Sequence, residues 1–118
     1  MGNKHLCNEL KLLYGIRCML TGLQEEEDLT FHHITKKSKK GKSTVANGAL
    51  LLYDIHQWLH NTTERENIET YYLIKDCLEL YKQCIIDKRE DLIDLYTNEV
   101  MPLFEEEYYE QRRLRKAT

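Results

Sequence analysis

The spacing of apolar positions predicts a helix and then a hairpin in the first third of the chain. Leucines recur among polar residues over 4–13 at the spacing of a short amphipathic helix, which Gly15 is expected to end. An acidic run at 25–28 then interrupts apolar and β-type residues. We therefore predict a β-hairpin from about residue 17 to residue 34, with residues 29–34 as its second strand.

The pattern becomes loop-like and then helical in the middle of the chain. Residues 35–46 are polar and basic and predict a loop, and the Asn-Gly pair at 47–48 is a turn signal. Apolar residues then fall near one helical face, which predicts a helix over 49–60. Thr63 with Glu66 three residues later fits a capping box, which would start the next helix.

The remaining apolar spacing predicts an almost wholly helical C-terminal region. One helix is expected from residue 68 to about residue 84, and a second follows a break at 87–89. Pro102 should kink or interrupt this second helix. Residues 103–116 continue it with glutamates first and cations last, the order that suits a helix dipole.

The composition fits a single small domain over residues 1–118. The chain is 42% apolar and 31% charged, which is typical of a globular protein and not of a disordered one. It has no apolar run of roughly 18 residues and no export signal, so we expect a cytoplasmic protein with no membrane partner. None of its four cysteines has CxxC spacing, and we expect them to be reduced.

The net charge of −3 is unevenly distributed along the chain. Residues 1–31 carry −2, residues 32–60 carry +4 and residues 61–118 carry −5. The acidic balance argues against a general nucleic-acid coat protein, whereas the basic block is what a phosphate backbone requires. The block consists of Lys36, Lys37, Lys39, Lys40 and Lys42. These lysines are either phosphate contacts or the charges of a solvated loop.

Four of the five histidines lie in the segment from His32 to His60. His56 and His60 are four residues apart in a predicted helix, so both imidazoles point the same way. This spacing is typical of a metal site, but two histidines on a helix surface would have it as well. His32 and His33 are neighbours on a predicted strand and therefore face opposite sides. If His32 binds a metal, His33 is placed for a separate role, and general base is the natural candidate because neutral imidazole titrates near pH 7.

Four segments of the chain together resemble the HNH endonucleases. They are Leu29-Thr-Phe-His-His-Ile, Lys39-Lys-Gly-Lys-Ser-Thr, Asn47-Gly-Ala-Leu-Leu-Leu and His56-Gln-Trp-Leu-His60. In that family a His-His or Asp-His pair ends a strand, and an Asn precedes the helix that carries the last His. His33 and Asn47 are 14 residues apart and Asn47 and His56 are 9 apart, which matches the common pattern. The pair His56-x-x-x-His60 is similar to the ending of the DNase-type colicins. The resemblance covers residues 16–60.

The resemblance implies a fold, a reaction and roles for the matching residues. The fold would be α+β: a ββα-metal unit over 16–60, with an N-terminal helix and a helical extension over 64–116. The reaction would be hydrolysis of DNA phosphodiester bonds with one divalent metal ion, leaving 5′-phosphate and 3′-hydroxyl ends. The implied roles are metal ligands for His32, His56 and His60, general base for His33, and a side chain that bridges the loop for Asn47.

The resemblance leaves the metal open and implies no structural zinc. A histidine-rich ligand set suits Zn, Ni, Mn or Co better than Mg, although Mg and Mn are common in the family. Many members hold a structural zinc with two CxxC pairs. Here Cys18 is the one matching cysteine, because Thr21, Leu52 and Ile55 occupy the other positions.

Two alternative functions are compatible with the same fold. The first is a binding or regulatory protein without strong catalysis, whose acidic C-terminal helices dock onto a basic protein partner. Small HNH-like proteins of this kind occur on phages and mobile elements, which would place this chain in a bacterial host cytoplasm. The second is a domain in which the metal is purely structural, so that chelation unfolds it.

Overall fold

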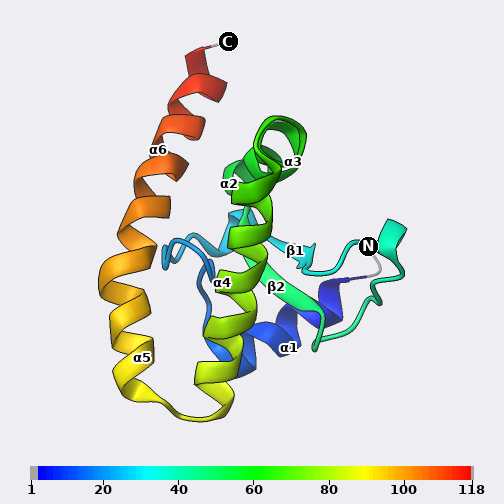
Figure 1. Cartoon of the computed structure of the whole chain (residues 1–118), viewed down its shortest axis with the longest axis vertical. Helices are drawn as coiled ribbons and strands as arrows, with labels where there is room; N and C mark the ends of the chain where they lie inside the picture. Colours follow the sequence, from blue (N-terminus) through cyan, green and yellow to red (C-terminus); the bar gives the residue numbers. More distant parts are fainter. Residues whose placement is uncertain (1–2, 118) are drawn as a thin grey trace.

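The computed structural model describes residues 3–117, so both ends of the predicted domain, 1–2 and 118, lie outside the described residues. It is a mixed, mainly helical structure with one two-stranded antiparallel sheet (Figure 1). The longer elements are α1 (Lys4–Tyr14), β1 (Leu29–His33), β2 (Gly48–Leu52), α2 (Tyr53–Trp58), α4 (Ile68–Ile86), α5 (Glu90–Leu95) and α6 (Met101–Ala117). The shorter ones are η1 (Glu26–Asp28), η2 (Lys37–Lys39), η3 (Leu59–Thr63), α3 (Glu64–Glu66) and η4 (Tyr96–Val100). No helix within residues 3–117 is both long and apolar enough to cross a bilayer.

The first helix forms as its leucine spacing predicts. α1 ends at Gly15, whose φ of +92° is a conformation that favours glycine. Leu6, Leu10 and Tyr14 form its buried face, and this face packs against the sheet.

The hairpin predicted over residues 17–34 is wrong in its first strand. β1 pairs instead with β2, in a register that places Leu29 opposite Leu52 and His33 opposite Gly48. The segment at 18–20 is fully buried core without regular structure, and Met19 donates its amide to the Leu50 carbonyl. An apolar run can fill a core without joining a sheet, which is why its composition was misleading.

The helix predicted over 49–60 is wrong at its start. Residues 49–52 belong to β2, and the helix begins only at Tyr53. Every residue of β2 is buried, so the strand has no polar alternation that would separate it from a helix. Gly48 is required at its start, because an added Cβ would lie 2.5 Å from the Phe31 ring.

The helix that follows β2 does not stop at the predicted capping box. It continues from α2 through the π turn η3 into α3, and the Thr63 hydroxyl donates to the Leu59 carbonyl within it. Asn67 caps α4 instead, because its side-chain oxygen accepts the Thr70 amide. The helix therefore carries His60 one turn beyond His56 without a break.

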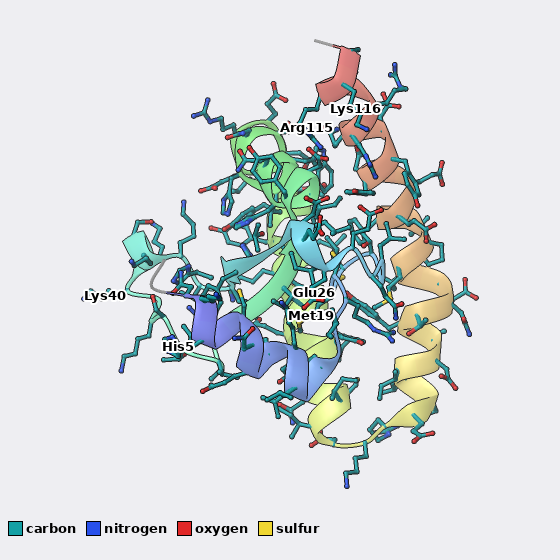
Figure 2. The ribbon with its side chains drawn as sticks, turned by 180° about the vertical axis from the view of Figure 1, so that it is seen from behind. His5, Met19, Glu26, Lys40, Arg115 and Lys116 are labelled. Atoms are coloured by element: carbon teal, nitrogen blue, oxygen red, sulfur yellow. The ribbon has the colours of Figure 1, made fainter. Side chains whose placement is uncertain are left out.

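The C-terminal helices turn back on α4 and reach α2. The predicted break at 87–89 is present, and the predicted disturbance at Pro102 is the π turn η4 immediately before α6. Along this return, Tyr96 stacks on Tyr81 with ring centroids 4.7 Å apart. Arg115, near the end of α6 (Figure 2), forms a bidentate pair with the buried Asp54 of α2 at 2.6 and 2.9 Å. α6 therefore braces the helix that carries His56.

Candidate metal centre

Three histidines predicted as metal ligands come together between β1 and the helix after β2. His32 comes from β1, His56 from α2 and His60 from η3. One ring nitrogen from each lies within 4.8 Å of the others, and the three ring centroids are 5.0 to 5.4 Å apart. The predicted clustering of these side chains is confirmed, and the cluster could hold a metal ion.

Local structure explains why these side chains converge. Strand alternation turns His32 inward, where it is 2% exposed, and leaves its neighbour His33 half-buried. His56 and His60 lie one helical turn apart on the same side. β2 leads into α2 without a loop, so the helix begins beside the strand that carries His32.

Thr30 fixes the proton position on His56. The Thr30 hydroxyl donates to the Leu51 carbonyl at 2.7 Å, so its single hydrogen is already used. Its oxygen is 2.8 Å from His56 Nδ1 and must therefore accept a hydrogen from that nitrogen. The proton of a neutral His56 then lies on Nδ1, which leaves the lone pair on Nε2, 3.4 Å from His32 Nδ1.

Glu64 orients the third histidine in the same way. His60 Nδ1 lies 2.9 Å from Glu64 Oε1, so the carboxylate accepts its hydrogen and Nε2 is the ring nitrogen left for a metal. The other carboxylate oxygen of Glu64 accepts from Lys36. These two hydrogen bonds, from His60 first and Lys36 second, lower the pKa of Glu64 and keep it ionised. The chain Lys36–Glu64–His60 thus ties the basic loop to the cluster.

The buried histidines are neutral at physiological pH. Burial first, and then the neighbouring imidazoles, lower the pKa of His32 to about 2 and that of His56 to about 4. A neutral imidazole is the form that binds a metal, because the proton and the metal compete for one lone pair. Three imidazole nitrogen donors, two of them on rings oriented by hydrogen bonds, fit a transition-metal ion.

His33 lies on the other side of the strand but opens into the same hollow. A cavity of about 250 Å³ is lined by His33, His56 and His60 together with Lys36 and Lys37. His33 Nε2 is 2.9 Å from Ser43 Oγ, and the Phe31 ring packs edge-on against its imidazole. Burial and the charge of Lys37 lower the pKa of His33.

The five lysines of the predicted phosphate-binding block do not gather at one place. Lys36 and Lys37 line the hollow over the histidines, and Lys39 lines a neighbouring cavity. Lys40 and Lys42 are exposed and line neither cavity, and Figure 2 shows Lys40 at the outer edge of the molecule.

Asn47 holds the two ends of the basic loop together. Its side-chain oxygen accepts the Thr35 amide at 2.8 Å, and its Nδ2 donates to the carbonyls of Thr35 and Lys42 at 2.9 Å each. These contacts lie inside the loop and not at the histidines. Asn47 therefore acts on the shape of the loop between β1 and β2.

Lys82 supports the same loop and was missed by the sequence prediction. Its ammonium on α4 donates to the carbonyls of Val45, Ala46 and Gly48 at 2.7, 3.0 and 2.5 Å. Burial lowers the pKa of Lys82 to about 8. A signal was present, because Lys82 lies one turn beyond Leu78, on the apolar face of the predicted helix. Thr30 was also missed, and nothing in the local pattern marks it. Glu64 was missed because the capping box predicted at Thr63 separates it from His60, although the two residues are four apart on one continuous helix.

Comparison of the chain with protein-family models, with curated proteins and with solved structures gives no match.

Proposed function

We propose that this protein is a metal-dependent endonuclease of the HNH type, which hydrolyses phosphodiester bonds of DNA. One observation carries the proposal: three imidazoles converge, and two of them, those of His56 and His60, line a hollow together with His33 and two lysines. A metal site, a candidate base and cations beside one opening are the groups that phosphodiester hydrolysis needs. The antiparallel β1–β2 pair followed directly by α2 supports the same interpretation.

In the proposed mechanism, His32, His56 and His60 hold one divalent ion. When bound, this ion supplies Lewis-acid stabilisation of the charge that develops on the phosphate and on the leaving oxygen. His33 takes the proton of the attacking water. The proposal places the hydrogen of the bond between His33 and Ser43 Oγ on His33 Nε2, so that the lone pair of Nδ1 accepts that proton. Its lowered pKa keeps His33 unprotonated at neutral pH.

The lysines at the hollow have separate parts in the proposal. Lys37 is exposed and contacts a phosphate of the DNA backbone. Lys36 is partly neutralised by Glu64, so it positions the carboxylate that orients His60. Lys39, Lys40 and Lys42 lie outside this hollow, and as phosphate contacts they would serve neighbouring parts of the strand.

Plasmid cleavage with a matched pair of histidine variants tests the proposal. We expect the purified protein to nick or cut supercoiled DNA with at least one of Mn, Mg, Ni or Zn. His33→Ala should lower the rate by roughly 10²–10⁴-fold, because it removes the base while leaving the metal ligands in place. His5→Ala is the control, since His5 is exposed on α1. If no metal supports cleavage, or if both variants cut like the wild type, the enzyme proposal is wrong.

The identity of the metal follows from the ligand set. Neutral nitrogen donors favour Zn, Ni, Mn or Co over Mg, which prefers oxygen ligands. Titration of the metal-free protein with each ion, read by calorimetry, should rank them. Chelation separates the two roles of the ion, because a catalytic metal leaves the circular dichroism spectrum largely intact, whereas a structural metal unfolds the domain on removal.

A second candidate function is a binding protein that uses α6. A cavity of about 530 Å³ is lined by three glutamates, Glu106, Glu107 and Glu110, against one cation, Arg113, which pairs with Glu110; Leu103 and Tyr109 complete the lining. A basic protein partner would suit this acidic surface. Charge reversal of Glu106 and Glu110 to Lys should abolish such binding and leave DNA cleavage unchanged.

A further inference from the structure

A second cavity lies directly beside the histidine centre. Its volume is about 470 Å³, and it runs between the start of the basic loop and the start of α4. Lys36 lines both this cavity and the hollow over the histidines. The ring of Tyr71, in its wall, lies 6.1 Å from the ring of His60, so the two cavities are neighbours.

The wall of the second cavity is aromatic and apolar. Tyr71 and Tyr72 come from consecutive positions of α4, and Ile34 and Ile68 complete the apolar lining. Tyr72 is 54% exposed, whereas Tyr71 behind it is 4% exposed. The two rings meet edge to face with centroids 5.7 Å apart, so the Tyr72 ring is held in place before any ligand arrives.

The rim of the second cavity is positively charged. Lys36, Lys39 and Lys75 line it, against the single carboxylate of Glu64. Lys36 pairs with Glu64 and Lys75 with Glu79, and among residues 3–117 no ion pair involves Lys39. An exposed aromatic face with cations around it matches a ligand that is flat, aromatic and anionic, and an unpaired nucleotide has all three properties.

We infer that the second cavity binds an unpaired base of the DNA strand whose phosphate lies at the histidine centre. The base stacks on Tyr72, and Lys39 contacts a phosphate next to it. A duplex cannot offer this base without unpairing it, so the preferred substrate is single-stranded or locally unpaired DNA. This inference rests on the proposed function and names its substrate class.

Binding of short phosphorothioate oligonucleotides tests the inference without cleavage. A fluorescent 12-nucleotide strand and the blunt duplex of the same sequence are titrated with the full chain, and strand integrity is checked on a denaturing gel. We expect the single strand to bind roughly 10-fold more tightly than the duplex. A strand with 2-aminopurine in place of adenine should lose fluorescence on binding, because the base stacks.

Three variants identify the stacking residue. Tyr72→Ala should weaken single-strand binding about 10-fold and abolish the 2-aminopurine response, while Tyr72→Phe keeps both. Leu73→Ala is the control, because Leu73 is the next residue on α4, is 57% exposed and lies outside the cavity lining. Lys39→Gln should reduce the salt slope of single-strand binding by about 0.7.

The outcomes separate this inference from the proposed function. If Tyr72→Ala binds the single strand as tightly as the wild type, or if the duplex binds equally well, the cavity is not a base site, whatever the cleavage assay shows. If the Tyr72 effects appear but no metal supports cleavage, the base site stands and the nuclease proposal fails.

Discussion

The ammonium of Lys82 provides the sharpest test of what holds the basic loop against the core. Replacing Lys82 with Met keeps the aliphatic stem and removes three hydrogen bonds, to the carbonyls of Val45, Ala46 and Gly48. It also removes a cation placed 5.4 Å from the centre of the Tyr14 ring. The carbonyls are left without this donor at a position where water has little access, since the Lys82 side chain is buried.

The expected cost follows from these contacts. A hydrogen bond from a charged donor contributes about 1.5–3 kcal/mol. The three bonds share one ammonium whose burial is itself unfavourable, so they do not add fully. We therefore expect Lys82→Met to lower the free energy of unfolding by about 2–4 kcal/mol, which corresponds to a fall in Tm of roughly 10 °C for a domain of this size.

Urea unfolding followed by circular dichroism measures this cost, with Lys75→Met as the control. Lys75 lies on the same helix and, within residues 3–117, pairs only with Glu79 one turn away, so its loss should cost about 0.5 kcal/mol or less. A difference between the two variants of less than about 0.5 kcal/mol would refute the reasoning. The Lys82 ammonium would then contribute no more to the free energy of unfolding than an exposed ion pair does.

Four further results are expected. Glu64→Gln should weaken metal binding about 10–100-fold in calorimetry, because the charge that polarises the third ligand is lost; unchanged affinity contradicts the hydrogen-bond argument. Asn47→Ala should cost about 2 kcal/mol in urea unfolding, since three hydrogen bonds are lost from a half-exposed loop. Tyr71→Phe should raise stability by about 1 kcal/mol, because its buried hydroxyl has no hydrogen-bond partner within the described chain. The metal-free protein should lose stability as the pH falls from 6.5 to 4: the unfolded state takes up protons near pH 6.5, whereas burial lowers the pKa of His56 to about 4 and of His32 to about 2. His56 alone accounts for up to about 3 kcal/mol, and a flat stability profile over that range contradicts the burial of these two groups.

The failed strand prediction shows where sequence patterns stop being informative. Residues 18–20 and 48–52 are both short and apolar, and both become fully buried. Only the second segment pairs with β1, because pairing depends on which backbone lies beside the strand in three dimensions. Neither segment alternates in polarity, so neither its structure nor its partner could be deduced from its own residues.

Predicting the residues of the histidine cluster required less knowledge of distant parts of the chain than predicting the strand pairing did. The spacing of four places His56 and His60 on one side of any helix, and alternation separates His32 from His33 on any strand. These local rules were sufficient to choose the three side chains that the structure brings together. The predicted hairpin was wrong, but the three predicted ligands still come together. Their prediction required only a strand at His32 and a helix at His56.

The sequence by itself determined the local geometry: the helix ended by Gly15, a strand at the adjacent histidines, and the helical spacing of the other two. Only the tertiary structure decided which strand pairs with β1, and which groups orient and support the site. Thr30 and Lys82 act on partners 26 and 34 to 37 residues away along the chain, whereas Glu64 acts on His60 one turn away in the same helix. Local periodicity describes a segment and its nearest turns, whereas a hydrogen bond to a distant residue exists only after the core has brought the two together.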